Sequence, residues 1–256
     1  MIFDTHAHYD DEAFDTDRDE LLKDMWKNGV EFVVNVGAGI ESSKKTLKLA
    51  ETYSFIYAAI GVHPSETGEM TEEDMVWLER NAADSKVTAI GEIGLDYYWK
   101  EPDKDIQKKW FERQLWLAGR VKLPVIIHSR DAAKDTLEIL KSWKKDKTAG
   151  VIHCYSYSKE MAREYLDMDF YFGIGGVITF KNARKLAEAV SYIPMNRILL
   201  ETDCPYLAPE PYRGKRNQSS YIDYVAQKIS EIKQISKEEV LIQTMQNAKD
   251  FYFRGQ

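Results

Sequence analysis

The sequence predicts a single (β/α)8 barrel, the α/β TIM-barrel fold in which eight parallel strands alternate with helices. Its length of 256 residues is close to that of one such barrel. Eight short apolar runs of β-strand character recur at intervals of a few tens of residues. All five histidines stand where such a run ends. We therefore expect one domain over residues 1–256, with its site at the C-terminal ends of the strands.

The apolar runs define the expected strands. Several are almost continuously apolar, which is typical of parallel strands that helices cover on both faces. The predicted strands are Ile2–Thr5, Val30–Val36, Phe55–Val62, Val87–Ile93, Val125–His128, Val151–His153, Phe170–Ile174 and Arg197–Glu201.

Helix signals lie between these strands. Residues 104–122 repeat apolar side chains at helical spacing, from Ile106 through Trp110 to Leu117, and thus predict an amphipathic helix. Thr71 and Asp74 have the spacing of a capping box. Strands that alternate with helices favour βαβ units. A doubly wound open sheet is the alternative, but its Gly-rich phosphate-binding first turn is absent.

The composition is that of an ordinary soluble protein, with 44% hydrophobic and 30% charged residues. Its apolar runs are too short to span a bilayer, so we expect no membrane contact. Two cysteines and no secretory signal predict a cytoplasmic location. The net charge of −7 argues against binding nucleic acid over the whole surface. A nuclease remains open, because local cations and metal ions can reverse the sign at a site.

Metal-binding residue types gather at the predicted strand ends. His6 and His8 close the first strand, and their spacing allows both imidazoles to face one ion. Glu92 ends the fourth strand, and its two oxygens could bridge two cations. His128 and His153 end the next two strands. Together these residues predict a metal centre.

Catalytic roles are expected for residues beside those ligands. Asp203, after the last strand, could bind metal, hold the attacking water and accept its proton. Glu201 faces the same side at a deeper level and is the competing candidate. His63, in Gly-Val-His-Pro, is expected to be a donor or acid that faces the substrate rather than a metal ligand.

These residues carry a resemblance to the TatD-type metal-dependent deoxyribonucleases, a branch of the amidohydrolase-like barrels. One departure is visible, because the family usually continues RGKRN with an acid and a proline, whereas Gln218, Ser219 and Ser220 follow here. The matching motifs are DTHAH at 4–8, GVHP at 61–64, GEIGLDYY at 91–98, VIIHSRDA at 125–132, IHCYS at 152–156, ETDCPYL at 201–207 and PYRGKRN at 211–217.

The resemblance implies a two-metal hydrolase with nuclease activity. It implies one cation on His6, His8, Glu92 and Asp203, and a second on Glu92, His128 and His153. We expect water activated by the metals to attack a phosphodiester, with Asp203 as base and Glu92 and His63 in supporting catalytic roles. Imidazole ligands suit Zn, Mn, Fe, Co or Ni better than Mg, although family activity is often associated with Mg.

Two loops and one arginine are candidates for binding DNA, with single-stranded ends as the expected substrate. Arg213 and Lys215 in the basic loop 211–217 could clamp phosphates. Tyr97, in the aromatic run after the fourth strand, could stack on unpaired bases. Arg130 could touch the substrate or pair with a neighbouring aspartate.

Two other functions remain open. One is a metal-dependent ester or amide hydrolase, such as an aminoacyl-tRNA deacylase, because fold does not fix function. The other, less favoured, is a non-catalytic protein that holds metal and interacts with others. The sequence indicates no obligate protein partner.

Overall fold

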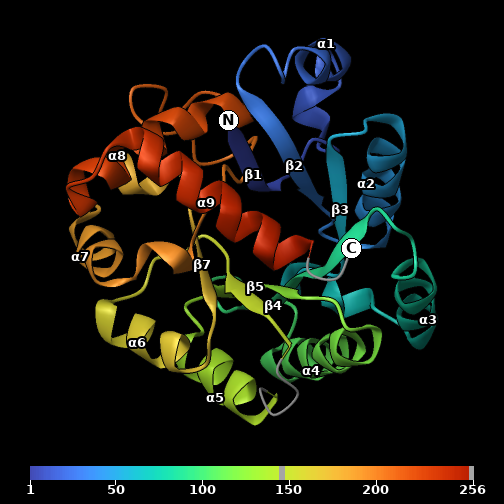
Figure 1. Cartoon of the computed structure of the whole chain (residues 1–256). Helices are drawn as coiled ribbons and strands as arrows, with labels where there is room; N and C mark the ends of the chain where they lie inside the picture. The colour runs from blue at the N-terminus through green and yellow to red at the C-terminus, as the bar shows by residue number, and fades with distance from the viewer. Residues whose placement is uncertain (144–147, 254–256) are drawn as a thin grey trace. The chain divides into compact units, whose positions relative to one another are not determined.

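Eight parallel strands follow one another in chain order in the computed structural model, which describes residues 1–143 and 148–253 (Figure 1). The fold is a (β/α)8 barrel, and each predicted strand overlaps an observed one. The strands are β1 (Ile2–Ala7), β2 (Val30–Val36), β3 (Ile56–Ile60), β4 (Val87–Asp96), β5 (Val125–Arg130), β6 (Gly150–Ile152), β7 (Tyr171–Ile174) and β8 (Ile198–Leu200).

Helices connect the strands throughout the described part of the chain. Among those residues, no helix is long and apolar enough to cross a membrane. The α-helices are α1 (Arg18–Lys23), α2 (Ile40–Thr52), α3 (Glu72–Asn81), α4 (Lys104–Val121), α5 (Ala133–Trp143), α6 (Lys159–Asp167), α7 (Arg184–Tyr192), α8 (Ile222–Lys233) and α9 (Lys237–Tyr252). Short 3-10 turns include η1 (Glu12–Phe14), η2 (Pro64–Glu69) and η6 (Ser219–Tyr221).

The chain divides into two compact units. The terminal unit comprises residues 1–35, 154–166 and 171 onward, and the central unit comprises residues 36–153 and 167–170. In the terminal unit β1 pairs with β2 and β7 with β8, and a bridge between Ala7 and Cys204 places the segment after β8 beside β1. Helices α8 and α9 pack together there, and α9 also packs on β1 and β8 (Figure 1).

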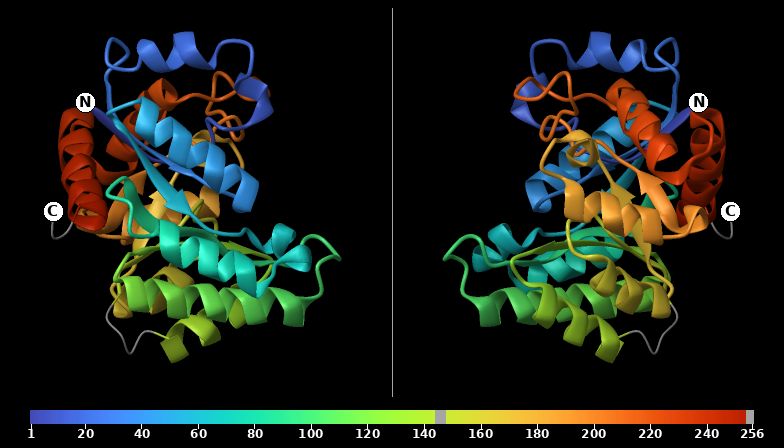
Figure 2. Two further views of the ribbon diagram at one scale, coloured as in Figure 1. Left: turned by 90° about the vertical axis from the view of Figure 1, so that its right-hand side faces the viewer. Right: turned by 90° about the vertical axis from the view of Figure 1, so that its left-hand side faces the viewer.

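The central unit contains β3 to β6, with α4 packed against β4 and α3 beside α4 (Figure 2). The helix predicted over 104–122 is confirmed as α4, and Trp110 and Leu117 are buried as expected. Ile106 is instead 39% exposed, because it lies in the first turn of the helix, ahead of the buried stretch. The predicted capping box is present at the start of α3, where Thr71 and Asp74 bond reciprocally.

Candidate metal centre

Three predicted ligands converge in the terminal unit. Nε2 of His6 lies 3.1 Å from Nε2 of His8. Oδ1 of Asp203 lies 3.3 Å from His8 Nε2 and 3.7 Å from His6 Nε2. These three donor atoms lie within 4.8 Å of one another, as the spacing of His6 and His8 and the place of Asp203 predicted. Two imidazoles and one carboxylate form a donor set that suits a divalent transition-metal ion.

Backbone hydrogen bonds hold this cluster in place. The Asp203 N–H donates to the carbonyl of His6 over 2.9 Å, and the His8 N–H donates to that of Cys204 over 2.8 Å. The segment after β8 is thereby fixed to the end of β1. Asp203 has φ of 59°, in the left-handed region that few non-glycine residues adopt and that aspartate adopts more often than most. The turn directs its carboxylate toward the imidazoles.

Asp4 is a buried supporting residue that sequence reasoning missed. Its carboxylate accepts hydrogen bonds from the backbone N–H groups of His6 and Thr202 and from the hydroxyls of Thr202 and Ser219. Burial raises the pKa of Asp4 to about 7, although the hydrogen bonds from Ser219 and Thr202 act against that rise. The sequence does place an acid, Asp4, within an apolar strand. A buried carboxylate requires hydrogen-bond donors, so its position indicates a structural role.

The segment after the basic loop, where the sequence departs from the family pattern, contributes hydrogen bonds to Asp4. Ser219 occupies part of the segment where the family pattern departs, and its Oγ lies 2.6 Å from Asp4 Oδ2 and 2.7 Å from Tyr9 Oη. Asn217 donates to the carbonyls of Thr202 and Tyr206. The departure therefore coincides with buried hydrogen bonds to Asp4 and Tyr9, residues close in sequence to the predicted ligands His6 and His8.

Asp203 and Glu201, which alternation left as competing candidates, have different surroundings. The Glu201 residue is 1% exposed, and its Oε1 accepts a 2.6 Å hydrogen bond from the backbone N–H of Cys154. The side chain of Asp203 retains 17% exposure. Water can therefore approach Asp203, whereas Glu201 lies deeper, as its place two residues earlier in the chain predicts.

Four predicted site residues come together in the central unit around one carboxylate. Oε1 of Glu92 lies 2.6 Å from His128 Nδ1, 3.2 Å from His153 Nε2 and 3.8 Å from His63 Nε2. Glu92 is buried within β4, which continues to Asp96 rather than ending at Ile93 as expected. The strand is longer because β5 pairs with it as far as Asp96.

The electrostatics of this cluster favour an ionised carboxylate at Glu92. Burial opposes ionisation of Glu92, but His153 and His128 hold its pKa well below the usual value. Burial also opposes protonation of His128, but Asp96 and Glu92 raise its pKa. Burial and the charge of His128 lower the pKa of His63 to about 3.

Asp96 is a second residue that sequence reasoning did not assign to the site. Its Oδ2 lies 3.1 Å from Nε2 of His128, and its Oδ1 accepts a 2.9 Å hydrogen bond from the N–H of Tyr98. The sequence carries a signal for Asp96. If the strand continues past Ile93, Glu92, Gly94 and Asp96 are alternate residues, so Asp96 faces the same side of the strand as Glu92.

The donor atoms of both clusters fit divalent metal ions. Each cluster combines ring nitrogens with a carboxylate oxygen. The donor atoms of His6, His8 and Asp203 lie within 4.8 Å of one another, and so do those of His63, Glu92 and His128. Imidazole nitrogens are suited to Zn, Mn, Co or Ni, whereas Mg prefers an all-oxygen shell. His63 contributes Nε2 to the central cluster, but its Nδ1 is engaged with Ser65, from which it accepts the backbone N–H over 3.1 Å.

The aromatic run after β4 contains one half-buried and two exposed rings. Tyr97 donates its hydroxyl to Asp135 over 2.7 Å, and the Nζ of Lys104 lies 4.2 Å above its ring. Tyr98 and Trp99 are each more than half exposed and meet edge to face. The guanidinium of Arg130 lies 3.8 Å from the centre of the Tyr98 ring. The structure thus places Arg130 against an aromatic face.

The basic loop of the terminal unit holds cations in different environments. Arg213 and Lys215 are exposed, and the guanidinium of Arg213 lies 4.3 Å from the centre of the Phe180 ring. Arg216 instead forms a two-pronged ion pair with Asp17 and donates to the carbonyl of Ala13. Arg213 and Lys215 therefore retain exposure, whereas Arg216 anchors the loop.

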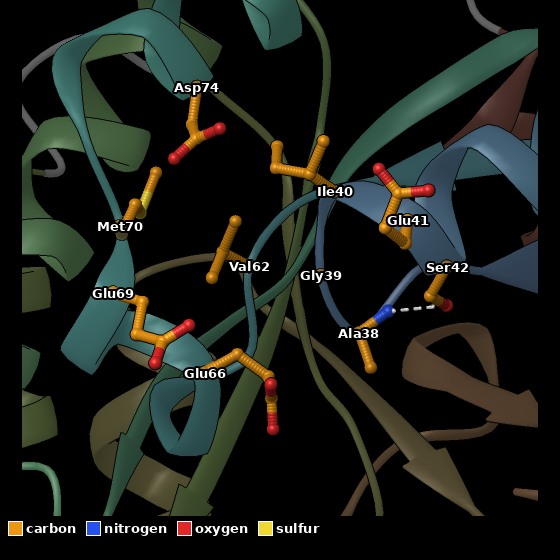
Figure 3. Close-up of a pocket in the computed structure, with 10 residues that line it drawn as sticks. All are labelled: Ala38, Gly39, Ile40, Glu41, Ser42, Val62, Glu66, Glu69, Met70 and Asp74. Carbon is orange, nitrogen blue, oxygen red and sulfur yellow. Dashed lines mark hydrogen bonds between the residues drawn. The ribbon is translucent and has the colours of Figure 1, made fainter.

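An acidic pocket with a volume of about 340 Å³ lies in the central unit (Figure 3). Its residues come from the start of α2 and from the segment that follows His63, with Val62 and Met70 on its apolar side. Such a lining repels phosphate and attracts ammonium groups. Its acidic residues are Glu41, Glu66, Glu69 and Asp74.

Comparison with known proteins places the chain among metal-dependent hydrolases. The family model described as TatD related DNase matches residues 3–253. An uncharacterized metal-dependent hydrolase, YabD of Bacillus subtilis, is 48% identical over 98% of this chain and 99% of its own length. YcfH of Escherichia coli K12, described in the same terms, is 35% identical over 96% of this chain and 94% of its own.

Solved structures of related proteins have the same fold over nearly the whole chain. The crystal structure of YjjV, a TatD homologue from Escherichia coli, superposes with a TM-score of 0.93 at 29% identity and covers 98% of each chain. A hydrolase of the TatD family from Entamoeba histolytica gives a TM-score of 0.88 at 26% identity, also over 98% of each chain.

Fold, donor clusters and relatives together define a metal-dependent hydrolase built on a (β/α)8 barrel. Within that class, the chain belongs to the TatD-related DNase family.

Proposed function

We propose that this hydrolase is a deoxyribonuclease, an exonuclease that shortens single-stranded DNA ends by hydrolysing phosphodiester bonds. The observation that carries the proposal is Asp203, a carboxylate that contacts two imidazoles and keeps 17% side-chain exposure. Such a group can act on a water molecule and on a cation at once. Membership of a family described as DNases supports DNA as the substrate.

We further propose that residues 1–256 act as one hydrolase domain with two divalent cations. His6, His8 and Asp203 would hold one ion, His128 and His153 would hold the other, and Glu92 would be shared. The fold class supports the sharing, because the C-terminal ends of the strands in a (β/α)8 barrel converge on one face. The proximity of His6, His8 and Asp203, and the contacts of His128 and His153 with Glu92, support this choice of ligands.

When bound, the two cations lower the pKa of water from about 16 toward roughly 7 and stabilise charge on phosphoryl oxygens. Asp203 would accept the proton of the attacking water as the water oxygen bonds to phosphorus and the P–O bond to the departing nucleotide breaks. His63 would donate from Nε2 to a phosphoryl oxygen, since its Nδ1 accepts from Ser65 and its proton therefore resides on Nε2.

The DNA would be held by side chains with access to solvent. Arg213 and Lys215 would neutralise phosphates. Arg130 and the aromatic run with Tyr97 would contact the unpaired bases, with Tyr98 adding an exposed ring for stacking. No residue in this set implies sequence-specific recognition.

Degradation of an end-labelled single-stranded oligonucleotide by metal-stripped protein, with Mg, Mn, Zn, Co or Ni added back, tests the proposal. We expect stepwise shortening that depends on the metal. Asp203→Asn should reduce the rate at least about 100-fold, whereas Asp24→Asn, an exposed acid in the same unit, should leave it unchanged. A rate near that of the wild type in Asp203→Asn would refute the assignment of the base.

The acidic pocket favours one other candidate function, hydrolysis of an aminoacyl-tRNA ester. An aminoacyl group carries an ammonium that the carboxylates would attract and a side chain that Val62 and Met70 would contact. The same metals and the same base would serve that ester. Release of the amino acid from aminoacyl-tRNA, weakened by Glu66→Gln but not by Arg213→Ala, would favour this function over DNA hydrolysis.

A further inference from the structure

One carboxylate in the central unit joins a predicted metal ligand to the loop that follows β4. Asp96 directs Oδ2 to the His128 ring at 3.1 Å and Oδ1 to the Tyr98 N–H at 2.9 Å. Both oxygens therefore have a polar partner, and the residue is only 3% exposed. Buried carboxylates with two separate donors hold those donors in a fixed orientation.

The backbone of Asp96 is itself fixed. Gln107 in α4 accepts from the Asp96 N–H over 2.9 Å and donates to the Asp96 carbonyl over 3.0 Å. The same amide also donates to the carbonyl of Pro102, which ties the loop back to the helix. The carboxylate is therefore presented to His128 from a rigid support.

The two nitrogens of His128 face different carboxylates. Nδ1 lies 2.6 Å from Glu92 Oε1, on the side where the other donors gather. Nε2 faces Asp96 instead. A neutral ring that donates Nε2–H to Asp96 has its lone pair on Nδ1, the nitrogen that faces Glu92. Histidines that bind metals commonly donate their second N–H to a carboxylate in this way.

We propose that Asp96 is a positioning residue that fixes the tautomer and ring orientation of His128 for metal binding. The proposal rests on the proposed ligand role of His128. Asp96 acts through that ring and does not itself hold the ion. Removal of its carboxylate should weaken binding of the ion held by His128 about 10–100-fold and leave the ion held by His6, His8 and Asp203 unaffected.

Equilibrium binding of Zn²⁺ to the metal-stripped full chain, in competition with a chromogenic chelator, tests this prediction without any DNA. The variants are Asp96→Ala, Asp96→Asn, His128→Ala and the double variant Asp96→Ala/His128→Ala. Asp135→Asn is the matched control, because Asp135 bonds Tyr97 and Lys108 in the same region. Circular dichroism and thermal unfolding of the metal-free proteins report whether each variant folds.

We expect Asp96→Ala to weaken Zn²⁺ binding only at the site that His128→Ala abolishes. Asp96→Asn should weaken binding at that site less. In the double variant, loss of Asp96 should cause no further weakening, because its effect passes through His128. Unchanged affinity in both Asp96 variants would overturn the proposal. The proposal would also be overturned if loss of Asp96 weakened Zn²⁺ binding equally with and without His128. A lowered melting temperature with normal Zn²⁺ affinity in Asp96→Asn would overturn it as well. Failure of the DNA assay alone would refute only the proposed substrate.

Discussion

The Oε1 atom of Glu92 lies 2.6 Å from Nδ1 of His128, between strands β4 and β5. The parallel register places Gly94, not a larger residue, opposite His128, so the two strands approach closely just where the carboxylate meets the ring. His153 lies on the following segment and contacts the same oxygen of Glu92. One buried carboxylate thus contacts both predicted histidine ligands of the central unit.

Glu92→Gln should abolish hydrolysis and reduce the metal content while leaving the fold largely intact. The amide keeps the shape of the side chain but removes the negative charge that balances the imidazoles and the ions. We expect at least a 100-fold loss of activity. The check is metal content by elemental analysis together with the rate on labelled DNA. Glu41→Gln, at an exposed position in the acidic pocket, is the control, and normal metal content in Glu92→Gln would contradict the shared-ligand role.

Gly94→Ala should destabilise the fold and disturb His128. A Cβ atom at Gly94 would lie 1.9 Å from the carbonyl oxygen of His128, and the residue has φ of +149°. Because this neighbour is a backbone atom, it cannot shift without distorting the strand. We expect a decrease of about 1–3 kcal/mol or more in the free energy of unfolding. Urea denaturation measures it. Gly39→Ala, whose Cβ would have its nearest neighbour at 3.7 Å, should change stability far less.

Tyr98→Ala should weaken binding of single-stranded DNA about 10-fold. The residue is 55% exposed, and the guanidinium of Arg130 lies against its ring. Stacking of one base on an aromatic ring contributes about 1–3 kcal/mol. The effect should appear in KM more than in kcat. Tyr97→Phe is the comparison, because it removes only the hydroxyl bound to Asp135 and keeps the predicted stacking surface. Equal KM values for Tyr98→Ala and the wild type would exclude a stacking role for Tyr98.

The ion pair between Asp17 and Arg216 should contribute to stability above pH 4 and lose that contribution in acid. Hydrogen bonds from Arg216 lower the pKa of Asp17 below its ordinary value of 3.8. A carboxyl with a lowered folded-state pKa stabilises the fold above the unfolded value and loses this effect as the pH falls through the folded value. Both side chains are about one-third exposed, so we expect no more than about 1 kcal/mol.

Urea unfolding of the wild type and Asp17→Asn at several pH values measures that contribution. The difference in free energy should be constant between pH 7 and about pH 5 and should shrink below pH 4. High salt should reduce it as well. A difference that grows on acidification would contradict the assignment. The nuclease rate at neutral pH and saturating DNA should change little, because Arg216 anchors the loop rather than the substrate.

The sequence by itself determined the fold class and the identity of the residues at the strand ends. Apolar runs and helical periodicity are local patterns, and burial of those runs selects the strands directly. The spacing of His6 and His8 fixed their common direction, since side chains of a strand alternate.

Only the tertiary structure decided the supporting contacts. Asp4 reaches Thr202 and Ser219, nearly two hundred residues away or more, through hydrogen bonds that no local pattern encodes. The continuation of β4 to Asp96 depends on pairing with β5, so the contact with His128 could not be predicted from the apolar run alone. Likewise Arg213 and Arg216 are indistinguishable in a basic loop until packing pairs Arg216 with Asp17. Strands follow from local sequence, whereas partners of polar side chains follow from distances between segments far apart in the chain.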